Sequence, residues 1–162
     1  MGRSPERQTV MAEITQNSKT PVYVGEFCHA IDGKNRITIP SEWRPAGEVE
    51  AEFFLIPSST ANCLTVMPRY ELDRIRAKAA VLPGAQRTAA LRRIGAMSRQ
   101  VTLDKHGRLS LPEEFCKQLN LAGNVTLSGV VETFEIWNTT EWTAAQAAQK
   151  AASDPILADL GL

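Results

Sequence analysis

The chain contains one ten-residue segment twice. Residues 31–40 read IDGKNRITIP, and residues 103–112, which lie 72 positions further on, read LDKHGRLSLP. Both segments carry an aspartate, an arginine four residues later, a short alternating stretch and a final proline. A repeat constrains the architecture before any single residue does, because each copy is expected to form the same local structure. We therefore expect two similar halves, each too small to bury a core alone, packed into one unit.

Each copy predicts the same order of elements: strand, turn, strand, short helix, hairpin and helix. Helices are expected over 69–80, 85–96 and 139–152, and a capping pattern at Asn138 and Glu141 marks the start of the last one. The expected divisions are a flexible extension over 1–21, a first repeat with its helix over 22–80, a linking basic helix over 81–97, a second repeat with its helix over 98–152 and a loose tail over 153–162.

Composition narrows the class of protein. Hydrophobic residues make up 43% and charged residues 22% of the chain, as in ordinary soluble globular proteins. No apolar run approaches the roughly 18 residues that a membrane span needs. The first residues carry charges but no apolar core of a secretory signal. We therefore expect a cytoplasmic protein with no membrane partner.

The sequence contains no catalytic or metal-binding motif that would suggest an enzyme. The three cysteines and two histidines have no metal-ligand spacing, and no glycine-rich phosphate loop or nucleophile elbow is present. We predict no catalytic residue, no metal site, no cofactor and no small-molecule substrate. The cysteines are expected to act as small buried hydrophobic residues.

Charge is distributed unevenly although the formal net charge is zero. Residues 68–108 hold ten basic and three acidic side chains, whereas the segments on either side are acidic. This pattern fits a cationic binding face, and it fits a solvated arginine-rich helix pair equally well. Charge alone does not distinguish the two interpretations.

The repeated motif predicts a rigid turn. Asn35 and Gly107 occupy equivalent positions just before the arginine, and these two residue types tolerate a positive φ best. Asp32 and Asp104 begin the turns, where a carboxylate can accept hydrogen bonds from backbone N–H groups. These four residues are the predicted turn-orienting residues.

Two turns of this kind would project cationic side chains in fixed poses. The predicted DNA-binding residues are Lys34 and Arg36 in the first copy and Lys105 and Arg108 in the second. A fixed guanidinium suits bidentate contact with phosphate or with guanine O6 and N7. The alternative is that each aspartate–arginine pair only stabilises its own turn and contacts no ligand.

These residues resemble the MraZ family of the AbrB-like, swapped-hairpin superfamily. The resemblance rests on the two D-x-x-x-R elements with their following strand and proline, on FEIW at 134–137, on the basic helix pair and on Trp142, and it covers about residues 22–152. It differs in the first turn, where Asn35 replaces the usual glycine, and in about twenty additional N-terminal residues.

The resemblance implies a fold and a function. The implied fold is α+β, with two tandem AbrB-like swapped-hairpin repeats forming a pseudodimeric, β-barrel-like core flanked by helices. The implied function is regulation, typically repression, of the protein's own cell-division and cell-wall gene cluster. It implies binding to direct repeats in promoter double-stranded DNA as a nucleoid-associated ring homo-oligomer, usually an octamer. Arg36 falls on the family's DNA-contacting arginine, and Arg108 is its second-copy counterpart, with a milder expected role.

A second hypothesis comes from a different class. An AbrB-like core could form a ring that captures a protein, as antitoxin relatives do, or could bind the nucleoid without sequence preference. Salt separates these hypotheses, because binding through several phosphates weakens steeply as salt rises.

Overall fold

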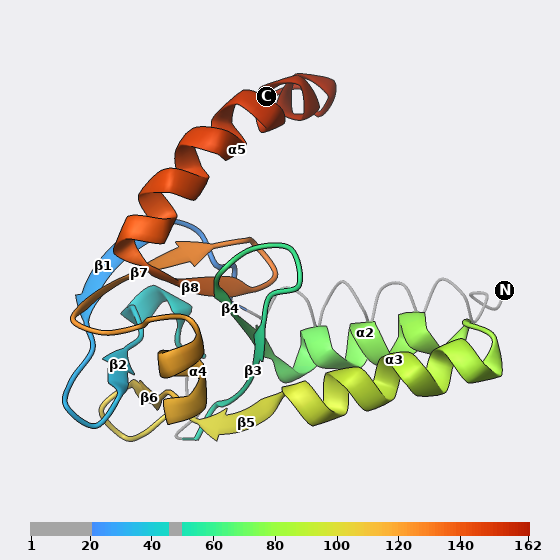
Figure 1. Cartoon of the computed structure of the whole chain (residues 1–162), viewed down its shortest axis with the longest axis horizontal. Helices are drawn as coiled ribbons and strands as arrows, with labels where there is room; N and C mark the ends of the chain where they lie inside the picture. The colour runs from blue at the N-terminus through green and yellow to red at the C-terminus, as the bar shows by residue number, and fades with distance from the viewer. Residues whose placement is uncertain (1–20, 46–49) are drawn as a thin grey trace, which may run out of the picture.

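The computed structural model describes residues 21–45 and 50–162, so the expected N-terminal extension lies almost entirely outside the described residues. The described chain has a mixed α+β fold, as expected (Figure 1). Its elements in chain order are β1 (Glu26–Ala30), β2 (Arg36–Thr38), the 3-10 helix η1 (Ser41–Trp43), β3 (Glu52–Pro57), β4 (Leu64–Pro68), α2 (Arg69–Ala80), α3 (Gly84–Met97), β5 (Arg99–Thr102), β6 (Arg108–Ser110), α4 (Glu113–Gln118), β7 (Asn124–Gly129), β8 (Phe134–Asn138) and α5 (Thr139–Asp159).

Six strands form one antiparallel sheet in the order β1-β7-β8-β4-β3-β5. Strand β1 pairs with β7, and β5 pairs with β3, so the first strand of each repeat joins the hairpin of the other repeat. The two hairpins meet in the middle, where β4 pairs with β8. If each strand is replaced by its equivalent in the other repeat, the same strand order results, read from the opposite edge of the sheet. The strand pairing therefore has an approximate two-fold symmetry, and its axis lies between the paired residues Thr65 and Glu135.

The remaining two strands, β2 and β6, form a separate antiparallel ribbon. Ile37 pairs with Leu109 at its centre, and both side chains are fully buried. The ribbon thus covers the six-stranded sheet with one apolar face and keeps its other face outside. Because its two strands come from different repeats, neither copy of the motif can form this ribbon alone.

An aromatic cluster occupies the core between the sheet and the elements around the ribbon. The Trp43 ring lies 5.0 Å from that of Phe134 and 5.1 Å from that of Phe27, measured between centroids. The Trp43 indole N–H donates to the carbonyl oxygen of Val24 at 3.1 Å, so its polar atom is satisfied. Phe115 of α4 is the second-repeat equivalent of Trp43 and is also buried.

The helices leave the sheet at two places (Figure 1). Helices α2 and α3 form a hairpin, and α2 spans the residues expected from the sequence. Asn138 caps α5 by accepting from the N–H groups of Thr140 and Glu141, as its capping pattern predicts. Helix α5 then continues seven residues past its expected end at Ala152, through Pro155. None of the helices described is long and apolar enough to cross a membrane.

Candidate nucleic-acid interface

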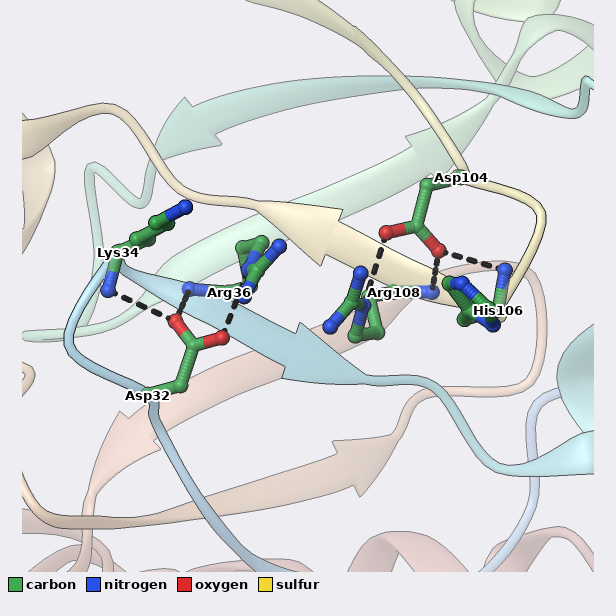
Figure 2. A network of polar contacts seen from close by, with 6 residues as sticks. All are labelled: Asp32, Lys34, Arg36, Asp104, His106 and Arg108. Carbon is green, nitrogen blue, oxygen red and sulfur yellow. Dashed lines mark hydrogen bonds and ion pairs between the residues drawn. The ribbon is translucent and has the colours of Figure 1, made fainter.

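The first turn is organised by one carboxylate. Asp32 Oδ1 accepts from the backbone N–H groups of Lys34 at 2.9 Å and Arg36 at 2.8 Å. Its other oxygen, Oδ2, accepts from Arg36 Nε at 2.7 Å (Figure 2). One side chain therefore fixes both the turn backbone and the direction of the arginine that follows it.

The second turn repeats this arrangement. Asp104 Oδ1 accepts from the backbone N–H groups of His106 at 2.8 Å and Arg108 at 2.9 Å, and Oδ2 accepts from Arg108 Nε at 2.8 Å. The arginine side chains are 28% exposed at Arg36 and 29% at Arg108. The two turns are therefore equivalent in geometry and in solvent access to the arginine.

Both turns contain a left-handed residue immediately before the arginine. Asn35 has φ 58° and Gly107 has φ 74°. The two positions differ in their surroundings, because a Cβ added to Gly107 would overlap the guanidinium of Arg44. Arg44 is held there by donating from Nε to the Ile39 carbonyl at 2.8 Å. Its second-repeat equivalent is the shorter Cys116, so only the second turn lies against an arginine at this position, and a larger residue than glycine there would have to displace the guanidinium.

The two turns also support one another. The N–H of Ile39, beyond β2, donates to the carbonyl of Gly107 at 2.9 Å, and the N–H of Leu111, beyond β6, donates to the carbonyl of Asn35 at 2.8 Å. Each left-handed residue is thus bonded to the strand that follows the other turn. The two arginine poses belong to one structural unit.

The outer face of the ribbon carries four side chains. In the antiparallel register, Arg36 is opposite Ser110 and Thr38 is opposite Arg108, so all four lie on the face away from buried Ile37 and Leu109. The two arginines are diagonal neighbours on paired strands, and their Cα atoms are expected to lie roughly 7–8 Å apart. Within the part of the chain that the structure describes, no hydrogen bond engages their terminal guanidinium nitrogens. As far as residues 21–45 and 50–162 are concerned, these nitrogens are available to bind a partner.

The other two predicted cations lie in different places. Lys34 is exposed, and its equivalent in the second turn is His106, which makes the matching backbone bond to Asp104 (Figure 2). Lys105 is exposed at the position that Gly33 has in the first turn. Lys34 and Lys105 are therefore not symmetry equivalents, and the structure adds His106 to the polar surface of the second turn.

The hydrogen bonds to the two aspartates lower their pKa values. For Asp104 the backbone N–H of Arg108 is the main cause, and it brings the pKa of the carboxyl to about 2. The pKa of Asp32 is lowered mainly by the backbone N–H of Arg36. Both carboxylates therefore stay ionised, and remain acceptors, throughout the neutral and mildly acidic pH range.

Sequence reasoning did not find Arg44 or the small outer residues Thr38 and Ser110. The signal for the outer residues was present in the alternation of β2 and β6, whereas the Arg44 contact depends on packing between repeats. No three His, Cys, Asp or Glu side chains gather as a metal site in residues 21–45 and 50–162. The chemistry of the site is therefore that of paired, oriented arginines.

Fold and site together define a protein that holds two equivalent arginine turns on one exposed ribbon. A family model described as "MraZ protein, putative antitoxin-like" matches residues 96–158. A transcriptional regulator MraZ from Clostridium tetani is 31% identical over 123 residues, covering 75% of this chain and 84% of the relative. One from Limosilactobacillus fermentum is 30% identical over 135 residues, covering 82% and 91%. The chain belongs to the MraZ family.

Proposed function

We propose that this protein is a sequence-specific DNA-binding transcriptional regulator that reads promoter DNA with the β2–β6 ribbon. The observation that carries the proposal is the outer face of the ribbon, where Asp32 and Asp104 orient Arg36 and Arg108, and where no other described residue bonds the terminal nitrogens of these arginines. Relatives that cover most of the chain bear the name transcriptional regulator.

The dimensions of the ribbon suit the major groove of B-DNA. That groove is about 12 Å wide and admits a two-stranded β-ribbon. Arginines roughly 7–8 Å apart span about two base-pair steps of 3.4 Å. The guanidinium of each arginine can make bidentate contact with guanine O6 and N7. We expect Lys34, Lys105 and His106, at the ends of the ribbon, to contact phosphates and set the register on the duplex.

The arrangement of the repeats, the assembly and the regulated promoter are proposed from the family resemblance. We propose that the two repeats form a swapped-hairpin pseudodimer, and the exchanged pairings of β1 and β5 support this. We further propose a ring homo-oligomer, usually octameric in the family, that binds direct repeats at its own cell-division and cell-wall promoter and represses it. Several weak sites on one ring would bind tandem repeats by avidity. The proposed location is the cytoplasm, on the nucleoid.

The test is a binding titration on DNA from upstream of the protein's own gene. Native and scrambled duplexes are titrated over a series of salt concentrations with the wild type, with Arg36→Ala and with Lys150→Ala. The last variant removes one positive charge from α5, away from the ribbon, and serves as the matched control. We expect steep salt dependence, preference for the native duplex, a preference reduced by about tenfold to a hundredfold in Arg36→Ala and no change in Lys150→Ala.

The same titration separates the alternatives. Binding of equal strength to both duplexes would replace the proposal with a general nucleoid binder. Absence of binding to either duplex at low salt would favour an antitoxin-like ring that captures a protein. Loss of assembly in Arg36→Ala, measured separately by gel filtration, would make the aspartate–arginine pair a purely structural element.

A further inference from the structure

Helix α5 extends from the sheet with little to pack against (Figure 1). Its first turns rest on β7 and β8, and the Trp142 indole N–H donates to Glu26 at 2.8 Å. Beyond them, α5 has no buried residue, although Ile156 is 62% exposed and Leu160 is 71% exposed just after its end. Helices of this length derive most of their stability from packing an apolar face. The outer part of α5 is therefore short of a packing partner within the described chain.

The internal symmetry indicates what kind of partner is missing. Helix α2 follows the first hairpin as α5 follows the second, and α2 packs along α3. Among the described residues no helix packs along the outer part of α5. Ala148, Ala152, Ile156 and Leu160 follow one another at four-residue spacing and form an apolar stripe on one face of the helix.

The α2–α3 hairpin offers a groove with apolar lining residues and a charge opposite to that of α5. A groove of about 410 Å³ between the two helices is lined by Ala77, Ala80, Leu91 and Arg87, together with the ion pair of Arg76 and Asp73. The hairpin helices carry seven basic and two acidic residues, whereas α5 carries three acidic and one basic. Asp159 lies one turn from Ile156, beside the apolar stripe.

We propose that the apolar stripe on the outer part of α5, formed by Ala148, Ala152, Ile156 and Leu160, docks into the α2–α3 groove of a second copy of this chain. Ile156 and Leu160 pack against Ala77, Ala80 and Leu91, and the acidic end of α5 lies near Arg87. Because donor and acceptor surfaces differ, the contact is heterologous, and repetition of it closes a ring or extends a filament. The inference rests on the proposed homo-oligomer and assigns the two surfaces that join its subunits.

The test mixes two defective variants in the absence of DNA. Ile156→Glu/Leu160→Glu blocks the donor helix, and Ala80→Glu/Arg87→Glu blocks the acceptor groove; all four side chains are exposed, so the fold is expected to survive. Lys150→Glu is the control. It lowers the net charge by two units, as the donor variant does, but Lys150 lies on a side of α5 away from the apolar stripe. Circular dichroism checks folding, and light scattering coupled to gel filtration measures mass.

We expect the wild type and Lys150→Glu to assemble, and each double variant alone to remain monomeric. Their equimolar mixture should form a dimer and nothing larger, because one intact donor meets one intact acceptor. Self-assembly of the acceptor variant would show that α5 pairs with α5 and would overturn the proposal. So would a mixture that stays monomeric, or a monomeric wild type. Since no DNA is present, failure here leaves the proposed DNA contacts of Arg36 and Arg108 untouched.

Discussion

The two copies of the motif share their backbone, their aspartates and their arginines, and they differ at a few positions within and beside the turns. Asp32 and Asp104 make the same three hydrogen bonds with distances that agree within 0.1 Å. By contrast, the left-handed residue is Asn35 in one turn and Gly107 in the other, and Lys34 corresponds to His106. What both copies keep is the pose of an arginine, whereas one of the residues that differ, Gly107, lies against an arginine of the other repeat, Arg44.

The largest expected effect is on DNA binding. Because the two arginines are equivalent in geometry and exposure, we predict that Arg36→Ala and Arg108→Ala weaken specific binding by a similar factor, about tenfold to a hundredfold each. The double variant should bind the promoter duplex no more tightly than it binds scrambled DNA. Fluorescence anisotropy with a promoter duplex measures this. A clearly milder loss in Arg108→Ala, as the family resemblance suggests, would show that DNA breaks the symmetry of the ribbon.

The next effect separates the two left-handed positions. Gly107→Ala places a Cβ on the Arg44 guanidinium at positive φ, so we expect a loss of about 2 kcal/mol in the free energy of unfolding. Asn35→Gly should change it by less than about 1 kcal/mol. Urea unfolding followed by tryptophan fluorescence, at one fixed protein concentration, compares them. If Arg44→Ala does not restore part of the stability of Gly107→Ala, the overlap is not the cause.

A smaller effect is expected where the two hairpins differ. The loop between β7 and β8 is two residues shorter than that between β3 and β4, and it places Val131 at φ 69°. A β-branched residue is strained there, so Val131→Gly should raise the free energy of unfolding by up to about 1 kcal/mol. Urea unfolding again measures the change. A destabilised variant would mean that the entropy glycine adds to the unfolded chain outweighs the strain relieved at Val131.

The smallest effect concerns pH. A lowered pKa in the folded state means that the carboxylate adds stability above its ordinary pKa of about 3.9 and loses that contribution as pH falls toward about 2. Asp104 should therefore keep its turn intact between pH 7 and 5. Carboxyl carbon chemical shifts in NMR measure its titration directly, with Asp104→Asn for assignment. A midpoint at or above 4 would show that the turn hydrogen bonds do not hold in solution.

Local structure could be predicted from the sequence, whereas strand partners could not. The bounds of α2, the Asn138 cap and the left-handed positions depend on residues within a few positions of one another. The pairing of β1 with β7 joins residues about a hundred positions apart, and no local pattern encodes it. The end of α5 was also mispredicted, because proline usually ends a helix. Here Pro155 forgoes one backbone hydrogen bond, and the helix continues through the following apolar residues.

At the site, the sequence indicated which residues matter but not how they face. Asp32, Arg36, Asp104 and Arg108 were evident from the repeat. Their assembly on one ribbon depends on a strand from each repeat, and Arg44 over Gly107 depends on packing between repeats. Lys34 and Lys105 were predicted as cations of their own turns, and the 72-residue spacing of the repeat places His106, not Lys105, at the position equivalent to Lys34.

The exchanged strands have a consequence for how the chain folds during synthesis. Strand β1 has no partner until β7 emerges from the ribosome about a hundred residues later, and β2 must wait for β6. At roughly 5–20 residues per second, this delay for β1 is on the order of 5–20 s. Throughout it, the first repeat exposes apolar strands that lack their partners. The nascent chain is therefore expected to depend on chaperones, and a chain terminated before β7 should aggregate rather than yield a half-active protein.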